Sequence, residues 1–212
     1  MQELLNEKKI IAILRKVPFD KLQQVMQAMY DGGIRFAEIT FDQASDTCIE
    51  DTTKAIAWTA ENFPDMYVGA GTVMTVEQCE AAFRAGARYI ISPDVNPDVI
   101  TKTVELGMLS IPGAFTPSEI AEAYRHGAAY VKVCPAGNLG PGYVKAIRGP
   151  ISHIPLFAVG GVELDNMEAF AKAGICGFGI GGNIIKKDLI EQNRFEELTE
   201  LARKYVELAE RL

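Results

Sequence analysis

The sequence predicts a compact α/β fold, a single (β/α)₈ TIM barrel over residues 1–212. Short apolar runs alternate with amphipathic stretches along the whole chain, and several runs have no polar face, as expected of parallel strands covered on both sides. Helical stretches end repeatedly in a glycine that suits a left-handed turn, at Gly33, Gly86, Gly107, Gly127 and Gly174. This alternation indicates a parallel α/β fold, and a doubly wound open sheet is the structural alternative.

The eight predicted strands are residues 10–14, 36–41, 67–72, 89–93, 109–113, 130–135, 156–161 and 177–182. Between them lie helical patterns such as FDKLQQVMQAMYDGG, TVEQCEAAFRAGA and TPSEIAEAYRHGA, and the last pattern is RFEELTELARKYVELAERL. A chain of 212 residues is near the lower end of the size range of such barrels. No linker or low-complexity segment divides it, so we expect one domain.

The composition is that of an ordinary globular protein, with 48% apolar and 23% charged residues and a formal net charge of −7. No block of like charge stands out, which argues against a nucleic-acid partner. The four cysteines are widely spaced without a CxxC pair, and His126 and His153 are the only histidines. These features disfavour a Cys/His zinc site.

The amino-terminal stretch MQELLNEKKIIAILRK contains an apolar run of only five residues. Such a run is too short for a signal peptide or a transmembrane helix. Because scattered cysteines also suit a reducing compartment, we expect a cytoplasmic protein with no membrane partner.

In a barrel of this kind the chemistry takes place at the carboxyl ends of the strands. The informative residues are therefore the polar ones inside or just after the apolar runs. They are Arg15, Glu38, Thr40, Thr72, Ser92 and Lys132, followed by the glycine pairs at 160–161 and 181–182.

Lys132, in AAYVKVCPA, is the only lysine embedded in an apolar strand. Alternation along the strand places it on the face opposite Val131 and Val133, so we expect it to point into the barrel. A buried ammonium is costly, and the lysine must therefore lose its proton or find a partner. A neutral amine in a water-poor pocket is what attack on a ketone carbonyl requires.

Glu38, in FAEITF, is the predicted partner of this lysine. A carboxylate beside the reacting amine can carry protons while water is added to and removed from an imine carbon. The alternative is a purely structural Lys–Glu pair inside the barrel.

Two glycine pairs follow the last two predicted strands, Gly160–Gly161 in AVGGVELDN and Gly181–Gly182 in GIGGNIIKK. In a (β/α)₈ barrel the loops after strands seven and eight are a frequent phosphate site. Glycines leave backbone N–H groups open to an oxyanion. The alternative is that these glycines serve tight turns only.

A combination of motifs runs in order through nearly the whole chain: IIAILR, GGIRFAEITF, VGAGTV, AGARYIISP, SIPGAFTPSE, YVKVCPA, FAVGGV and GIGGN. In these segments the chain resembles the class I bacterial aldolases for 2-keto-3-deoxy-6-phosphogluconate (KDPG) and 4-hydroxy-2-oxoglutarate (KHG), with their 2-keto-3-deoxy-6-phosphogalactonate (KDPGal) relatives. The resemblance implies a homotrimeric, metal-free lyase without a cofactor. Its expected substrates are a phosphorylated sugar acid, cleaved to pyruvate and glyceraldehyde 3-phosphate, or the keto acid 4-hydroxy-2-oxoglutarate, cleaved to pyruvate and glyoxylate.

The resemblance also implies roles for single residues. Lys132 matches the Schiff-base lysine, Glu38 the general acid/base, and Arg15 an arginine that contacts the anionic substrate. The remaining matches line the pyruvyl pocket (Thr72 and Pro93) or form the phosphate loops (Gly160, Gly161, Gly181, Gly182 and Asn183).

Three positions depart from the family pattern. Asp42, in EITFDQAS, stands where the phosphogluconate-type enzymes carry an arginine that binds the pyruvate carboxylate. Either Arg15 holds the carboxylate, or Asp42 faces outward and hydrogen-bonds within the 42–45 turn. Cys134 stands in place of a common phenylalanine and Asn183 in place of a common serine. FAVGGV and NLGPGYVKAI are more similar to the phosphogalactonate branch.

Two other functions remain compatible with these residues. One is a phosphosugar isomerase or epimerase that uses Glu38 as a base without a covalent intermediate, since one fold hosts many activities. The other is a non-catalytic phosphosugar-binding barrel, a reading that Asp42 favours.

Overall fold

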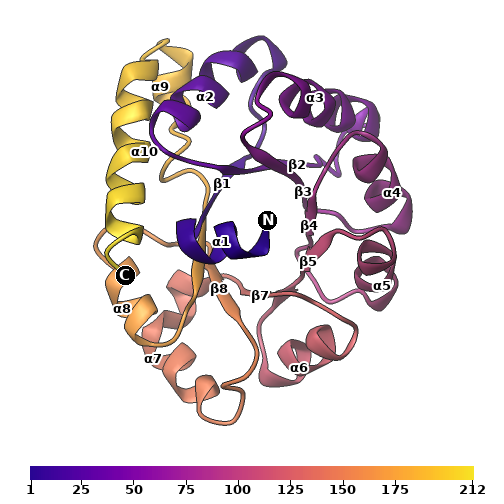
Figure 1. The fold of residues 1–212 in the computed structure, drawn as a ribbon, viewed down its shortest axis with the longest axis vertical. Helices are drawn as coiled ribbons and strands as arrows, with labels where there is room; N and C mark the ends of the chain where they lie inside the picture. Colours follow the sequence, from indigo (N-terminus) through magenta and orange to yellow (C-terminus); the bar gives the residue numbers. More distant parts are fainter.

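The computed structural model describes all residues, Met1–Leu212, as one barrel of parallel strands surrounded by helices (Figure 1). Nine strands form a single sheet in the order β5-β4-β3-β2-β1-β9-β8-β7-β6. Their bounds are β1 Ile10–Leu14, β2 Phe36–Thr40, β3 Tyr67–Gly71, β4 Tyr89–Ile91, β5 Leu109–Ile111, β6 Gly113–Ala114, β7 Val131–Val133, β8 Leu156–Val159 and β9 Gly177–Ile180.

Strands β5 and β6 are two pieces of one segment, interrupted at Pro112, which has no N–H to donate. β5 pairs with β4 and β6 pairs with β7, so this segment closes the barrel. The backbone N–H of Lys132 donates to the Pro112 carbonyl at 2.9 Å across the closure. Counted as one segment, β5 and β6 complete the eight predicted strands, and the (β/α)₈ fold is confirmed over the doubly wound alternative.

Eight helices follow the strands and cover the outside of the barrel. They are α2 Phe19–Asp31, α3 Cys48–Asn62, α4 Val76–Arg84, α5 Pro97–Glu105, α6 Pro117–Arg125, α7 Ala136–Arg148, α8 Met167–Lys172 and α10 Phe195–Ala209. The five glycines predicted to end helices all have left-handed φ angles, between 73° and 104°. They allow each helix to stop and the chain to turn back into the next strand.

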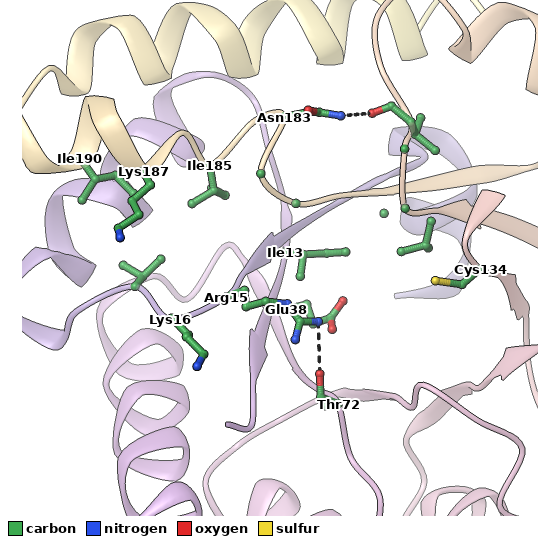
Figure 2. A pocket seen from close by; sticks show the side chains of 18 of the residues that line it. Ile13, Arg15, Lys16, Glu38, Thr72, Cys134, Asn183, Ile185, Lys187 and Ile190 are labelled. Atoms are coloured by element: carbon green, nitrogen blue, oxygen red, sulfur yellow. Dashed lines mark hydrogen bonds between the residues drawn. The ribbon is translucent and has the colours of Figure 1, made fainter. Parts of the chain in front are cut away.

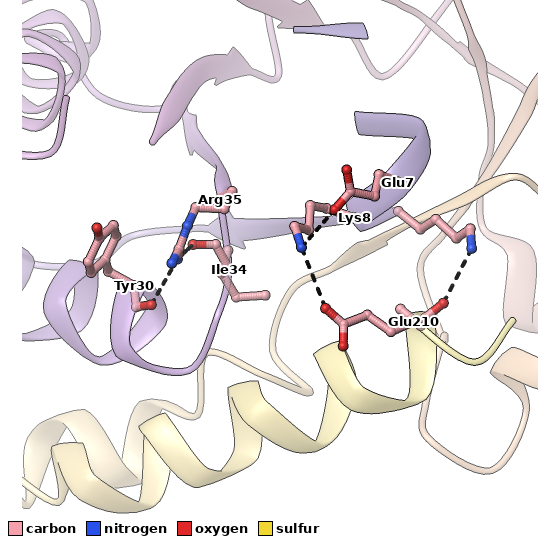
Figure 3. A network of polar contacts seen from close by, with 8 residues as sticks. Glu7, Lys8, Tyr30, Ile34, Arg35 and Glu210 are labelled. Atoms are coloured by element: carbon pink, nitrogen blue, oxygen red, sulfur yellow. Dashed lines mark hydrogen bonds and ion pairs between the residues drawn. The ribbon is translucent and has the colours of Figure 1, made fainter. Parts of the chain in front are cut away.

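Two further helices, α1 Gln2–Lys8 and α9 Lys187–Glu191, were not predicted from the sequence. In Figure 1, α1 lies within the ring of strands, and its Leu5 is fully buried in one cluster with Phe36 and Phe157. Lys8 ties α1 to the end of α10 through an ion pair with Glu210 at 3.5 Å (Figure 3). Helix α1 therefore closes the end of the barrel at which the strands begin. No helix of the chain is both long and apolar enough to span a bilayer.

The barrel interior is shaped by inward-facing glycines on β3 and β9. A Cβ atom added at Gly177 would lie 2.2 Å from the Phe157 ring, and one added at Gly71 would lie 1.7 Å from Glu38 Oε1. The glycines thus leave the space that large side chains of neighbouring strands occupy. On β3, the Glu38 carboxyl group therefore lies over Gly71, at the carboxyl end of the strand.

Candidate active site

A cavity of about 1010 Å³ opens at the carboxyl ends of the strands. Its walls come from strand ends, from the loops after them, and from the first turns of α2 and α9 (Figure 2). All ten residues predicted as site residues line it: Arg15, Glu38, Thr72, Pro93, Lys132, Gly160, Gly161, Gly181, Gly182 and Asn183. The structure therefore brings the predicted residues together in one place.

Lys132 is the central residue of β7 and is only 8% exposed. Its neighbours Val131 and Val133 are fully buried in the main core, so the lysine faces the interior as predicted. Gly113 on β6 leaves room beside it, because a Cβ there would lie 3.0 Å from Lys132 Cε and 2.5 Å from the Pro93 carbonyl oxygen. Pro93 and Lys132 are thus neighbours at the base of the cavity.

Glu38, the central residue of β2, is 2% exposed. Burial raises the pKa of this carboxyl group to about 7, although the positive charges of Lys132 and Arg15 act in the opposite direction. No ion pair within 4.0 Å joins Glu38 to Lys132. The structural Lys–Glu pair considered as an alternative therefore has no direct contact, and the carboxyl can gain or lose a proton near neutral pH.

Thr72 follows β3 in a left-handed conformation, with φ 57°, which is unusual for a β-branched residue. Gln43 Nε2 donates to its carbonyl oxygen at 2.7 Å, and Gln78 Nε2 donates to Gln43 Oε1 at 2.8 Å. Arg15 donates to the Thr72 hydroxyl at 3.5 Å, the contact drawn in Figure 2. Strained conformations of this kind persist where surrounding contacts hold them, often at functional sites.

The two glycine loops form one wall of the cavity. Gly160 and Gly161 have φ angles of 83° and 73°, and the Gly137 N–H donates to the Gly160 carbonyl at 2.8 Å. Asn183 Nδ2 donates to the Val162 carbonyl at 2.8 Å and so joins the two loops (Figure 2). The backbone N–H groups of four residues in this wall donate to no other group of the protein, those of Gly161, Val162, Gly182 and Asn183. The wall is rich in donors suited to an oxyanion.

Asp42 does not line the cavity. One carboxylate oxygen pairs with Lys16 at 2.9 Å and the other accepts from the Ala44 N–H at 3.3 Å. The hydrogen bond from Lys16 and then that from Ala44 hold the pKa of Asp42 below its usual range. The Asp42 carbonyl also accepts from the Ser45 N–H at 2.9 Å. Of the two outcomes considered for Asp42, the structure has the outward-facing one in the 42–45 turn.

Sequence reasoning missed several cations at the mouth of the cavity, Lys16, Lys21 and Lys187. Lys187 pairs with Glu191 on α9 at 3.4 Å, and Lys21 donates to Asn193 Oδ1 at 2.7 Å. The basic pair directly after GIGGNII was the available signal for Lys187. No group of three or more His, Cys, Asp or Glu side chains is arranged to hold a metal ion.

Comparisons with known proteins agree with this geometry. The family model described as KDPG and KHG aldolase matches residues 1–201. A probable 2-dehydro-3-deoxy-6-phosphogalactonate aldolase from Rhizobium meliloti (strain 1021) is 35% identical over 85% of this chain and 83% of its own length. A 2-dehydro-3-deoxy-phosphogluconate aldolase from Haemophilus influenzae is 30% identical over 97% and 95% of the two chains.

Among solved structures, the KDPG aldolase from Legionella pneumophila, with pyruvate captured as a covalent carbinolamine intermediate, superposes with a TM-score of 0.84. That structure is 25% identical in sequence, and the match covers 94% of this chain and 95% of the other. The family match and the relatives extend over almost the whole barrel. The chain therefore belongs to the KDPG and KHG aldolase family and is an aldolase, a carbon–carbon lyase.

Proposed function

We propose that this aldolase reversibly cleaves a phosphorylated 2-keto-3-deoxy sugar acid to pyruvate and glyceraldehyde 3-phosphate through a Schiff base on Lys132. The same chemistry would cleave 4-hydroxy-2-oxoglutarate to pyruvate and glyoxylate. The observation that carries the proposal is the buried, unpaired Lys132 at the base of the cavity, beside a carboxyl whose pKa is about 7. The pyruvate carbinolamine of the Legionella relative is the kind of adduct that such an amine forms.

In the first stage the Lys132 amine attacks the C2 carbonyl, and the carbonyl oxygen takes a proton from Glu38. The nitrogen then returns one proton to the Glu38 carboxylate, which gives a neutral carbinolamine. Glu38 next donates this proton to the hydroxyl, which leaves as water, so that an iminium ion and a Glu38 carboxylate remain. Glu38 is suited to this exchange because a group with a pKa near the working pH can both donate and accept.

In the second stage the Glu38 carboxylate removes the proton from the C4 hydroxyl. The C3–C4 bond breaks, an aldehyde forms at C4, and the electron pair moves into the iminium to give an enamine. Protonation at C3 and hydrolysis then release pyruvate and return the free amine. The iminium acts as the electron sink for bond cleavage.

The cavity also suggests how the two anionic ends of the substrate are held. Arg15 and Thr72 adjoin Glu38 and would bind the keto-acid end, with Pro93 beside Lys132. The phosphate would bind at the glycine loops, where N–H groups of Gly161 and Gly182 have no acceptor in the protein. Phosphorylated acids should therefore have a higher kcat/KM than their non-phosphorylated analogues, and equal values would contradict the phosphate site.

Borohydride reduction in the presence of pyruvate tests the covalent chemistry. We expect one reduced pyruvyl adduct per chain, and peptide mapping should place it on Lys132. An adduct on Lys145 or Lys172 would contradict the assignment. An isomerase or epimerase without a covalent intermediate, or a barrel that only binds phosphosugars, would gain no adduct, so the trapping separates these alternatives from the aldolase.

We further propose that the chain forms a homotrimer, on the strength of the sequence resemblance, and that it is cytoplasmic, because its scattered cysteines suit a reducing compartment. Sedimentation should give three times the mass of one chain. A stable monomer at the concentration of the activity assay would contradict the trimer.

A further inference from the structure

Two oxygen atoms inside the barrel have no hydrogen-bond partner, Glu38 Oε2 and the hydroxyl of Tyr89. Both side chains are almost completely buried, with exposed fractions of 2% and 0%. Tyr89 does not line the cavity, so it lies beneath the reacting groups rather than among them. Buried polar atoms in native proteins nearly always have a partner, protein or water, and two orphaned atoms in one interior need an explanation.

The strand register brings these two side chains toward each other. Glu38 pairs with Gly69 on β3, and Ala70 pairs with Ile90, so Gly69 is also level with Tyr89 on β4. Gly69 therefore separates the two polar residues with no side chain of its own. A Cβ at Gly69 would lie 2.2 Å from Tyr89 Cε2 and 2.5 Å from Cζ, the atom that carries the hydroxyl.

The Glu38 side chain lies over the same strand from the other side. A Cβ at Gly71 would lie 1.7 Å from Glu38 Oε1 and 2.4 Å from Cδ. The tyrosine ring thus covers Gly69 and the carboxyl covers Gly71, two positions farther along β3. Positions at this spacing are roughly 7 Å apart along a strand. One water joins two oxygen atoms up to about 5.5 Å apart, so a bridge through one water requires the Tyr89 hydroxyl to extend past Gly69 toward the carboxyl.

We propose that Tyr89 is a positioning residue for Glu38, whose hydroxyl donates across one buried water to Glu38 Oε2 and holds the carboxyl over Gly71. This inference rests on the proposed function, in which Glu38 transfers protons. A water with two buried oxygen partners resolves both orphaned atoms at once. The ring also fills the space over Gly69, which keeps the carboxyl from folding down into the barrel.

The charged groups that face Glu38 are Lys132 from β7 and Arg15 from the end of β1, and the titratable neighbour from β4 is Tyr89. Burial, and then the charge of Glu38, raise the pKa of Tyr89 well above 10. The hydroxyl therefore keeps its proton and acts as a donor. A donor to the carboxylate favours its charged form, so loss of the hydroxyl should raise the pKa of Glu38.

The test compares wild type with Tyr89→Phe and with the matched control Tyr130→Phe. Tyr130 also lies inside the barrel, but its hydroxyl donates to Asn6 Oδ1 at 2.5 Å, at the end of the barrel that helix α1 closes. The readout is kcat/KM for retro-aldol cleavage as a function of pH. A Glu38 that stays protonated offers no carboxylate to remove the proton from the C4 hydroxyl, so activity falls as pH decreases through the pKa of Glu38.

In Tyr89→Phe we expect the acidic limb of the kcat/KM–pH profile to move to higher pH by about one unit. At pH values above the limb, kcat should change less than about twofold. In Tyr130→Phe the limb should stay at the wild-type position. A Tyr89→Phe limb that coincides with that of wild type would overturn the proposal and leave Tyr89 as a packing residue only. Borohydride trapping on wild type and both variants separates the failures: a missing adduct in wild type contradicts the Schiff base, whereas an unmoved limb with normal trapping contradicts only the role of Tyr89.

Discussion

The two ends of the barrel interior differ although the same strands build both. Near the strand starts the interior is filled by Leu5, Phe36, Tyr130 and Phe157, each at most 1% exposed. Two residues farther along β2 and β7 the inward positions are Glu38 and Lys132, at the base of an open cavity. One pleat repeat thus separates a packed floor from reactive groups.

This difference shows how the chain tolerates a buried carboxyl and a buried lysine. Each large apolar side chain buried in the floor contributes about 1.5–3 kcal/mol to folding. The raised pKa of Glu38 means that ionising it in the folded protein costs free energy. The apolar packing at the start of the strands offsets that cost. Substitutions there should mainly lower stability, whereas substitutions around Glu38 and Lys132 should mainly lower activity.

The largest effect is expected for Lys132→Arg. A guanidinium stays protonated and cannot form an imine, so turnover should fall below detection. Borohydride trapping with pyruvate should give no adduct, while circular dichroism should show a folded barrel. Measurable turnover by the folded variant would remove Lys132 from the mechanism.

Glu38→Gln should lower kcat by about a hundredfold or more, the usual contribution of a general acid–base group. Binding of a pyruvate analogue should change much less, because the amide keeps the shape of the side chain. The measurement is steady-state kinetics together with analogue titration. A near-normal kcat would reduce Glu38 to an electrostatic neighbour of the lysine.

Two glycine variants compare the ends of the barrel directly. Gly71→Ala places a methyl group where the Glu38 carboxyl lies, so we expect kcat to fall roughly ten- to hundredfold. Gly177→Ala places one against the Phe157 ring at the floor, so we expect a loss of about 1–3 kcal/mol in unfolding free energy with kcat nearly unchanged. Denaturant unfolding and steady-state kinetics on both variants check this. If the two substitutions changed kcat and unfolding free energy to the same extent, the distinction between the packed floor and the reactive site would be wrong.

A further prediction concerns stability as a function of pH, where the effect grows only gradually from zero at low pH. The pKa of Glu38 is raised in the folded state from 4.5 to about 7, so its contribution to stability is complete below pH 4.5 and is lost as pH rises through 7. Glu38→Gln does not titrate, and relative to wild type it should gain up to about 3 kcal/mol between pH 4.5 and 8. Parallel stability curves for the two proteins would show that the carboxyl is not perturbed by folding.

Much of this arrangement follows from local sequence patterns. The strands were predictable because parallel strands in a barrel are apolar runs bounded by turn residues. Lys132 and Glu38 were identified because a charge inside such a run is rare. The paired glycines marked the loops at positions 160–161 and 181–182, and all of these residues line one cavity.

What the sequence did not predict depends on register or on very short segments. Helix α1 has seven residues and a single buried side chain, Leu5, which is too little for a helical period to emerge. Lys21 and Lys187 lie on polar stretches and look like any surface lysine until the barrel brings α2 and α9 to the mouth. The approach of Tyr89 to Glu38 over Gly69 requires knowing which residues pair across three strands.

The closure of the barrel at Pro112 has a consequence for its motions. Because β5 and β6 pair with different neighbours and the residue between them donates no hydrogen bond, the sheet is interrupted there. In native-state hydrogen exchange, the amides of β5 and β6 should therefore exchange through smaller openings than those of β2 and β3, which share the longest ladder of the sheet. The strand carrying Lys132 borders this segment, so transient opening of the barrel would begin beside the reacting amine.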